Sequence, residues 1–189
     1  MERRHHTRFV GLTLALLAFA AFAGSAYADE LESWDKKITN ASKRFEVLKD
    51  FNNEAVEDKE TGLVWEKSPG ETDGVAGITA ADKVTWNGAR DHCANKLVGD
   101  RKGWRLPSFF ELTSLIDPNA TSVPPLPVGH PFTNIQSFAY WSATTVAVDP
   151  TQAWSADTQS VIVDFDNDVK TLTLFVWCVR GGQAGPANY

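Results

Sequence analysis

The distribution of apolar and polar residues divides this chain into segments of different character. Residues 1–28 hold a short basic start and a long uncharged run, whereas residues 29–44 are charged and have few large apolar side chains. From Phe45 onward, short apolar runs alternate with turn-forming residues, which is typical of a folded domain built from short elements. We therefore expect a charged tether at residues 29–44, one domain at residues 45–182 and a short tail at residues 183–189.

Apolar runs bounded by turn residues predict the β-strands of this domain. We expect strands at residues 45–48, 63–65, 140–148, 161–165 and 172–179. The segment 50–62 is rich in turn-forming residues, and residues 68–77 form a loop rich in Gly and Asp. The Asp166-Asn167-Asp168 tripeptide is predicted to make a turn between the last two strands.

The first predicted helix lies between these groups of strands and begins at Thr85. Its apolar residues Trp86, Ala89, Cys93 and Leu97 recur three and four positions apart. This spacing places them on one face of a helix, which predicts that the face is buried.

The second predicted helix has a clearer start signal. Ser108 follows Pro107, and Glu111 comes three residues later, which gives the S-x-x-E pattern of a capping box. The helix is expected to end at Asp117-Pro118. The apolar residues expected to face the core are Leu112, Leu115 and Ile116.

The segment 118–138 has no periodicity and holds five of the nine prolines. A loop of about twenty residues inside a compact domain is uncommon and is often functional. Proline restricts the backbone of the folded loop as well as that of the unfolded chain, so we expect this loop to be stiff. We therefore predict that this loop binds a ligand, with His130, Phe132 and Phe138 in contact with it. Trp154 is a further candidate outside the loop, because an aromatic ring can stack on a sugar face.

The N-terminal segment has the parts of a secretory signal peptide. Arg3, Arg4 and Arg8 precede an uncharged run that ends in small residues at Ala26 and Ala28. The alternative is an uncleaved membrane anchor, because the run is just long enough to span a thin bilayer. The Ala-x-Ala site favours cleavage after Ala28. We therefore expect a periplasmic or secreted protein whose mature chain does not insert into a membrane.

The charge of the mature chain argues against polyanionic partners. Residues 1–28 carry three basic residues and one acidic residue, which leaves 15 Lys and Arg against 23 Asp and Glu, a net charge of −8. This balance opposes binding to nucleic acid or anionic lipid. The common catalytic and nucleotide-binding motifs are absent. We expect no enzyme activity and no cofactor, and the sequence leaves the oligomeric state open.

Cys93 and Cys178 are the only cysteines. In an exported protein an even number of cysteines predicts a disulfide, which here would close a loop of about 85 residues. The alternative is a pair of buried thiols. His92 precedes Cys93, but neighbours on a helix point about 100° apart, which argues against a His-activated thiol.

Short motifs occur in a defined order along the predicted domain. They are T-G-L-V-W at 61–65, T-W at 85–86 with Cys93, W-R-L-P-S at 104–108 with Glu111-Leu112, Y-W-S at 140–142 and C-V-R-G-G at 178–182. Together they resemble the bacterial family named for the C-terminal domain of the Legionella collagen-like adhesin. The resemblance covers nearly the whole of residues 45–182.

This resemblance implies a fold and a role. The family resembles, more distantly, the C-type-lectin-like fold that formylglycine-generating enzymes share. It implies an α+β domain in which two helices flank a small twisted antiparallel sheet with a long irregular loop region. In that fold a cysteine of the first helix pairs with one of the last strand, here Cys93 with Cys178. It also implies binding, often to glycans or host surfaces, more than catalysis.

The residues of the motifs are expected to shape the fold more than to bind a ligand. Arg105 and Arg180 have a second interpretation, because a guanidinium can clamp a carboxylate or sulfate through its fork. Glu111 is expected to cap the helix together with Ser108. The structural motif residues are Trp104, Arg105, Pro107, Ser108, Glu111, Trp141 and Arg180.

Asp164, Asp166 and Asp168 alternate, and calcium prefers clustered oxygen ligands. The calcium-binding residues of the lectins, of Glu-Pro-Asn and Trp-Asn-Asp type, are absent from the corresponding region. We therefore expect an exposed acidic hairpin there and no metal site.

These observations favour an exported, non-enzymatic binding module that recognises a glycan or a cell-surface protein through the loop 118–138. Its acidic charge differs from what a glycosaminoglycan-binding member of the family should have. The alternative is a structural or assembly subunit of a periplasmic or extracellular complex, with residues 29–44 in contact with the partner. An enzyme of the formylglycine-generating type is least favoured, because its reactive cysteines would have to be the two expected to form the disulfide.

Overall fold

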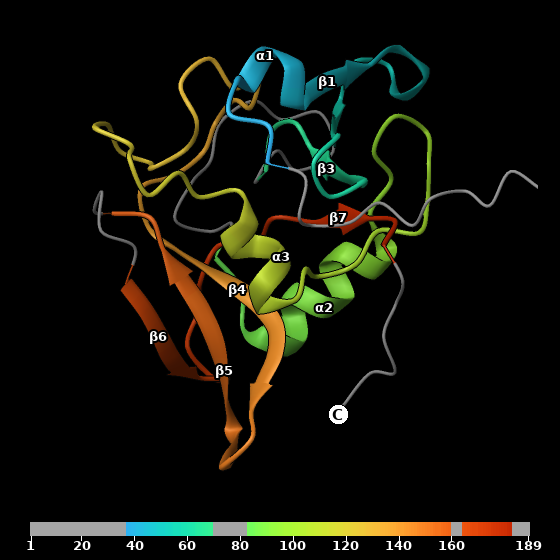
Figure 1. The fold of residues 1–189 in the computed structure, drawn as a ribbon. Helices are drawn as coiled ribbons and strands as arrows, with labels where there is room; N and C mark the ends of the chain where they lie inside the picture. Colours follow the sequence, from blue (N-terminus) through green and yellow to red (C-terminus); the bar gives the residue numbers. More distant parts are fainter. Residues whose placement is uncertain (1–36, 70–82, 160–163, 183–189) are drawn as a thin grey trace, which may run out of the picture. The chain divides into compact units, whose positions relative to one another are not determined.

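The computed structural model describes residues 37–69, 83–159 and 164–182. The expected signal peptide, most of the Gly- and Asp-rich loop, residues 161–163 of an expected strand and the expected tail lie outside these ranges. Within them, a few short helices and two antiparallel sheets form an α+β fold (Figure 1). The described part of the chain contains no helix that is both long and apolar enough to cross a bilayer.

The first sheet has the strand order β1-β2-β3-β7. Its strands are β1 (Phe45–Leu48), β2 (Ala55–Asp58), β3 (Leu63–Glu66) and β7 (Val179–Arg180). The strands predicted at 45–48 and 63–65 are confirmed. β2 lies in the segment 50–62, whose sequence predicts turns. It forms because it pairs on both sides, with β1 and with β3, and this pairing outweighs its weak strand propensity.

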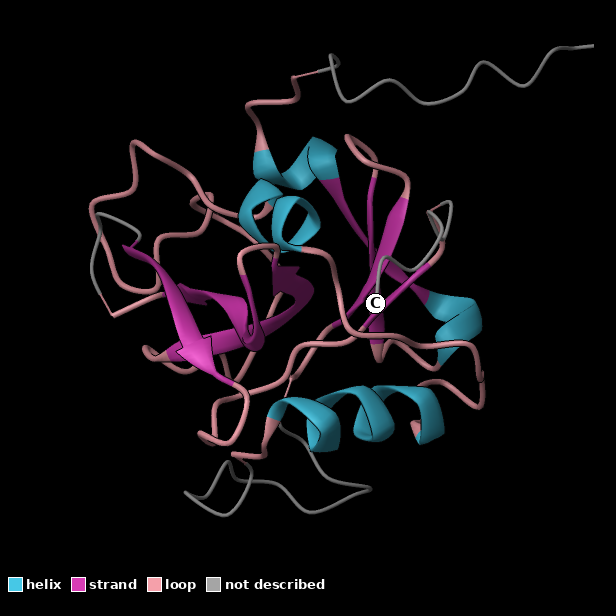
Figure 2. Cartoon of the chain, turned by 90° about the horizontal axis from the view of Figure 1, so that it is seen from below, coloured by secondary structure: helices cyan, strands magenta, loops and turns pink. Residues whose placement is uncertain are grey.

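The second sheet has the order β4-β5-β6 and lies apart from the first, as Figure 2 shows. Its strands are β4 (Ala139–Val146), β5 (Asp149–Asp157) and β6 (Asp164–Val169). The single small sheet implied by the resemblance is therefore two sheets. The turn predicted at Asp166-Asn167-Asp168 is wrong, because these residues pair with β5 inside β6. Small residues fill the buried positions of β5, which is why its apolar pattern is weak: they are Ala153, Ser155 and Ala156.

The segment 172–179, predicted as a strand, is extended and lies between two parts of the core. Its first residues make only isolated bridges, and regular pairing starts at β7. Successive side chains enter different clusters of buried residues. Those of Leu174, Val176 and Cys178 enter one cluster, and those of Phe175, Trp177 and Val179 enter the other. A segment that is buried on both faces is apolar at every position, which explains the uninterrupted run.

The helix α2 (Trp86–Asn95) begins where the sequence predicts it. The Thr85 hydroxyl accepts a hydrogen bond from the Gly88 N–H at 3.3 Å, and Trp86, Ala89 and Cys93 are buried. The helix ends before Leu97, which is 50% exposed, so the expectation that Leu97 belongs to the buried face is wrong. The reason is that Lys96 takes an extended backbone conformation and turns the chain out of the helix.

The helix α3 (Phe109–Ser114) has the predicted capping box. The Ser108 hydroxyl accepts from the Glu111 N–H at 3.3 Å, and the Glu111 carboxylate accepts from the Ser108 N–H at 2.7 Å. Leu112 and Leu115 are buried as expected. Between the first strands, the short 3-10 helix η1 (Lys49–Phe51) leads to Asn52 and Asn53, whose φ angles of 54° and 62° are left-handed.

The folded domain begins before Phe45, within the expected tether. The helix α1 (Ala41–Arg44) ends in a buried arginine, which is 6% exposed. The Arg44 guanidinium donates two hydrogen bonds of 2.8 Å to the Asp58 carboxylate and one of 2.8 Å to the Ser114 carbonyl. Asp58 is fully buried in β2, so this fork connects α1, the first sheet and the end of α3.

We expect the Asp58→Asn variant to be less stable by about 3–5 kcal/mol, because the buried Arg44 guanidinium loses its two-pronged carboxylate partner and keeps only the longer ion pair of 3.6 Å with Glu60. The free energy of unfolding in urea measures this loss. The control is Glu46→Gln, which removes an exposed carboxylate paired with Lys59 and should leave the midpoint unchanged. Equal midpoints for both variants would show that the Arg44–Asp58 pair does not anchor the domain.

Candidate functional site

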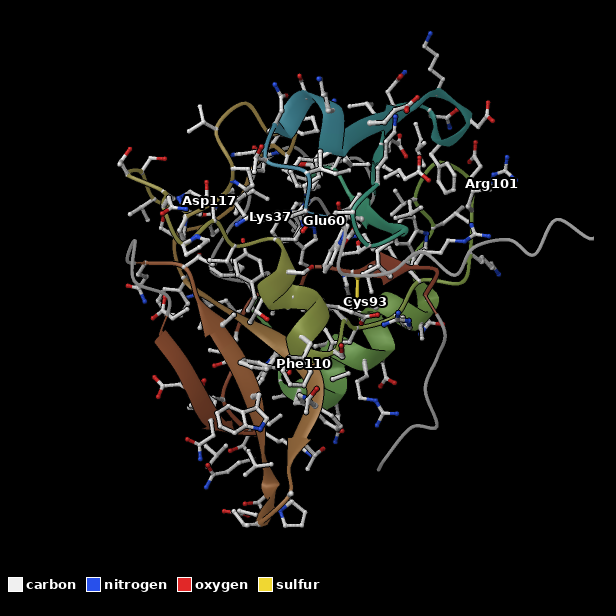
Figure 3. All side chains as sticks on the ribbon, in the orientation of Figure 1. Lys37, Glu60, Cys93, Arg101, Phe110 and Asp117 are labelled. Atoms are coloured by element: carbon white, nitrogen blue, oxygen red, sulfur yellow. A yellow bond between two sulfur atoms is a disulfide. The ribbon has the colours of Figure 1, made fainter. Side chains whose placement is uncertain are left out.

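The disulfide expected between Cys93 and Cys178 is present, and its Cα atoms are 5.5 Å apart. It joins the last turn of α2 to the residue before β7, across 85 positions of sequence. Both cysteines are fully buried, and the chain has no free cysteine. Figure 3 shows Cys93 beside α2, in the interior of the domain. The middle of the chain is therefore held covalently to its C-terminal part.

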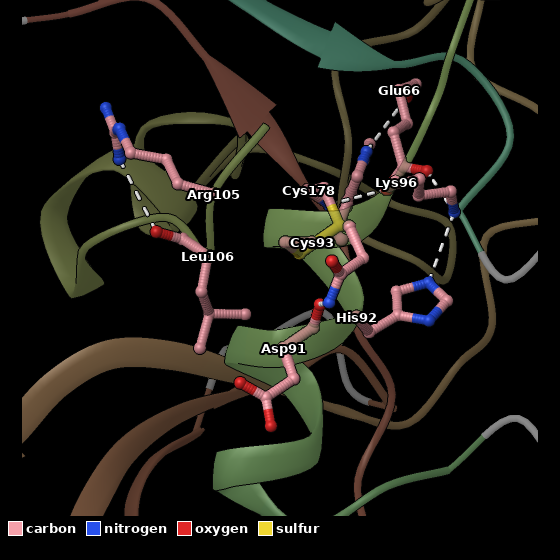
Figure 4. Close-up of a disulfide and its surroundings, with 10 residues drawn as sticks. Glu66, Asp91, His92, Cys93, Lys96, Arg105, Leu106 and Cys178 are labelled. Carbon is pink, nitrogen blue, oxygen red and sulfur yellow. Dashed lines mark hydrogen bonds and ion pairs between the residues drawn. A yellow bond between two sulfur atoms is a disulfide. The ribbon is translucent and has the colours of Figure 1, made fainter. Parts of the chain in front are cut away.

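A buried carboxylate lies beside the disulfide, as Figure 4 shows. Glu66, the last residue of β3, is 2% exposed. One carboxylate oxygen accepts a hydrogen bond of 2.6 Å from the Cys178 N–H, and the other forms an ion pair with the Lys96 ammonium. The Glu66 carbonyl accepts from the Trp177 indole N–H at 2.9 Å. Burial raises the pKa of Glu66, and the Lys96 charge and the Cys178 N–H oppose that rise.

Lys96 extends this set of polar groups to a second hollow of the surface. Its ammonium lies 3.4 Å from His92 Nε2, on the preceding turn of α2. Lys96 lines two cavities, one of about 430 Å³ that also includes Glu66 and one of about 290 Å³ that also includes His92. The ion pair therefore lies between two solvent-accessible spaces.

The larger cavity is walled by loops that are hydrogen-bonded to one another. The Lys67 N–H donates to the Glu54 carbonyl at 2.9 Å, and the Thr133 N–H donates to the Lys67 carbonyl at 2.8 Å. The Asn134 amide donates to the Ser68 hydroxyl at 2.7 Å. Asn53, Leu97 and Val98 complete the lining. Glu66 and Lys96 are the buried charged residues of this set and form its floor.

The proline-rich loop 118–138 lines this cavity with Thr133 and Asn134 and is anchored in the core. Leu126 and Phe132 are 2% and 5% exposed and belong to one cluster of buried residues. The Asp117 N–H donates to the Pro125 carbonyl at 2.9 Å, which closes the first half of the loop. Val128, in contrast, is 80% exposed. The loop is thus held from inside and presents its other side to solvent.

Phe132, predicted to contact a ligand, is a core residue. Its ring lies between those of Phe45 and Trp177, with centroids 5.1 and 5.0 Å away. Because it is almost fully buried, it is not available to a ligand in this structure, and that expectation is wrong. Sequence reasoning placed it on the surface because a loop without periodicity gives no sign of which residues point inward.

The other predicted contact residues do not gather at one place. His130 is half-buried with its ring 5.8 Å from that of Phe132, and burial lowers its pKa. Phe138 packs against Phe175, and the Lys83 ammonium lies 3.2 Å from the centre of its ring. Trp154 packs instead against Phe109 at the start of α3, with a centroid distance of 5.4 Å. None of them lines the larger cavity.

The guanidinium of Arg105 is already engaged inside the protein. It donates to both carboxylate oxygens of Glu111, at 2.8 and 2.6 Å, and to the Gly181 carbonyl at 2.8 Å. Its fork is therefore not free to clamp an external carboxylate. Arg180 lies against the Phe51 ring at 5.6 Å. Trp104, Pro107 and Trp141, the other large residues of these motifs, are buried.

The described acidic residues of β6 have different surroundings. Asp166 is exposed, and the Asp168 carboxylate accepts a hydrogen bond of 2.6 Å from the Ser155 hydroxyl. The side chain of Asp164 lies outside the described residues. No group of three or more metal-ligating side chains occurs among the residues that are described.

The fold and the disulfide define a class of protein: a small α+β domain in which a disulfide joins the helix α2 to the segment just before the last strand, β7. Residues 54–180 match the family model described as the Lcl C-terminal domain. The match covers more than half of the chain, so the protein belongs to the Lcl C-terminal domain family. It includes the disulfide, the Glu66–Lys96 pair and the proline-rich loop. A comparison with curated proteins gave no match.

Sequence reasoning missed the pair formed by Glu66 and Lys96. A charged residue at the end of an apolar strand is usually exposed, and no local pattern distinguishes a buried one. The available signal was weak: His92 and Lys96 are four positions apart, which places them on one side of a helix. The partner of Lys96 lies 30 positions earlier in the sequence, so only the tertiary structure reveals it.

We expect Glu66→Gln to lower the free energy of unfolding by about 3–5 kcal/mol, because the variant keeps the side-chain shape but leaves the Lys96 ammonium buried without a counter-charge. Urea unfolding with the disulfide intact measures the effect. The double variant Glu66→Gln with Lys96→Met should recover most of the loss. A double variant as unstable as the single one would contradict an ion-pair role.

Acid should destabilise the protein through Glu111. Burial opposes ionisation of its carboxyl, but hydrogen bonds from Arg105 and Ser108 outweigh burial and hold the pKa below its ordinary value of 4.5. A lowered pKa in the folded state means that the contribution is complete above pH 4.5 and is lost as the pH falls through the folded pKa. Melting temperatures between about pH 3 and 7 should show a shallower acid decline for Glu111→Gln than for the wild type. Identical declines would assign the effect to other groups.

Proposed function

We propose that this protein is an exported, non-enzymatic binding module that recognises a cell-surface glycan through the loop 118–138 and the cavity at its end. The observation that carries this proposal is the anchoring of the loop from within. Leu126 and Phe132 hold it in the core while Val123 and Val128 are 44% and 80% exposed. A loop that is already held by the core loses less conformational entropy when a ligand binds.

Export is supported by two independent features. The N-terminal segment has the composition of a cleavable signal peptide, with the expected cut after Ala28. The Cys93–Cys178 bond is of the kind that persists in the periplasm or outside the cell. We propose a periplasmic or secreted location on this basis.

A binding role is also supported by the state of the cysteines. Both are bonded to each other, so neither serves as a free nucleophile or metal ligand of the formylglycine-generating type. The loop 118–138 lies between the two halves of the disulfide in sequence, which is the order of a C-type-lectin-like domain. We propose that fold for the domain.

Arrays of glycans and of purified cell-surface proteins test the proposal directly. The mature wild-type protein should bind a defined set of glycans, and Val128→Asp, at the exposed side of the loop, should weaken that binding about tenfold or more. The matched control is Val148→Asp in the turn between β4 and β5, where the side chain is 94% exposed. This control should bind as the wild type does.

Other outcomes would overturn the proposal. Binding to a protein and to no glycan would assign the module to a protein partner. A glycan-blind oligomer in size-exclusion light scattering would favour the assembly subunit. Glycan binding that both variants retain would remove the loop from the site.

A further inference from the structure

The cavity of about 430 Å³ at the end of the loop has an unusual lining for a ligand pocket. Pockets for drug-like ligands are mostly apolar and aromatic. This one has no aromatic residue in its lining and is formed largely by carboxylates, ammonium groups, amides and hydroxyls. Leu97 and Val98 are its apolar members, and Leu97 is half-exposed at its edge.

The charges of this lining balance. Its carboxylates belong to Glu54 and Glu66, and its ammonium groups belong to Lys67 and Lys96. Glu66 and Lys96 neutralise each other in the floor, and the Glu54 carboxylate accepts a hydrogen bond of 2.7 Å from the Gly99 N–H. No excess positive charge is present to hold a sulfate or a carboxylate, and no excess negative charge is present to hold a cation.

The walls of the cavity are held in place by contacts within the protein. Its walls are connected by backbone hydrogen bonds from Lys67 to Glu54 and from Thr133 to Lys67. Gly99 approaches the backbone of Phe51 so closely that no Cβ would fit there, which fixes the loop that follows α2. Hydroxyl and amide groups at the cavity therefore have set positions, as specific recognition of a polar ligand requires.

We infer that this cavity binds one or two uncharged sugar units at the end of a glycan, an inference that rests on the proposed function. Sugar hydroxyls both donate and accept hydrogen bonds, which suits a lining of carboxylates, amides and hydroxyls without net charge. The volume lies within the range of about 300–1,000 Å³ in which small ligands are held. The half-exposed Leu97 offers an apolar edge to the C–H face of a ring. A sulfated sugar fits this lining less well than a neutral one, because the two carboxylates and two ammonium groups leave no net positive charge.

Asn134 provides a sharp test, because it lines the cavity, its amide donates a hydrogen bond of 2.7 Å to the Ser68 hydroxyl and its φ angle is 54°. Glycine adopts this left-handed conformation without strain, so Asn134→Gly removes the amide and keeps the backbone. Asn52 is a matched control: it has the same φ of 54°, it also donates a side-chain hydrogen bond, and it does not line the cavity.

The experiment is an NMR titration of the mature protein with maltose, cellobiose, lactose and diacetylchitobiose, and with a sulfated heparin disaccharide. At least one neutral disaccharide should bind, Asn134→Gly should raise its Kd about tenfold, and Asn52→Gly should leave it unchanged. Leu97→Trp, a second variant that fills the edge of the cavity from a half-exposed position, should abolish binding. The sulfated disaccharide should not bind.

Failure of this inference differs from failure of the proposed function. If the glycan arrays are positive and loop-dependent but the neutral disaccharides bind equally well to all variants, the sugar site lies elsewhere. Preference for the sulfated disaccharide would overturn the charge argument. Absence of binding on the arrays as well would overturn both proposals.

Discussion

The buried carboxylate of Glu66 is the constraint on which the arrangement of this domain depends. A carboxylate removed from water is tolerated only when its oxygens are paired and hydrogen-bonded. Here the partners come from two distant segments, the Cys178 backbone and the Lys96 side chain. The disulfide joins the same two segments covalently. Together these contacts set the end of β3, the end of α2 and the start of β7 in one place.

The chain near Cys178 shows how this constraint extends into the core. Residues 174–179 run between two clusters of buried side chains and contribute alternately to each. The Trp177 indole, which enters one cluster, also donates to the Glu66 carbonyl. Hydrophobic packing and the polar contacts therefore specify the same register of this segment, and a slip by one residue would disrupt both.

The same contacts create the surface that we propose to be functional. Lys96 leaves the helical conformation to reach Glu66, and the chain then turns outward at Leu97. The space beside this turn is closed on its other side by the end of the proline-rich loop, through Thr133 and Lys67. The cavity therefore lies where the chain turns outward after Lys96, and the Glu66–Lys96 ion pair contributes one charge of each sign to its lining.

The sequence alone determined much of the local structure of this protein. The capping box at Ser108, the start of the helix at Thr85 and the strands at 45–48 and 63–65 follow from signals within a few residues, because caps and periodicity are local. The family and the cysteine pair also followed from the sequence. Only the tertiary structure decided that β2 and β5 are strands, that Phe132 is buried and that Glu66 meets Lys96. These features depend on partners distant in sequence, and neither a weak apolar pattern nor a lone charge reveals which partner will bury it.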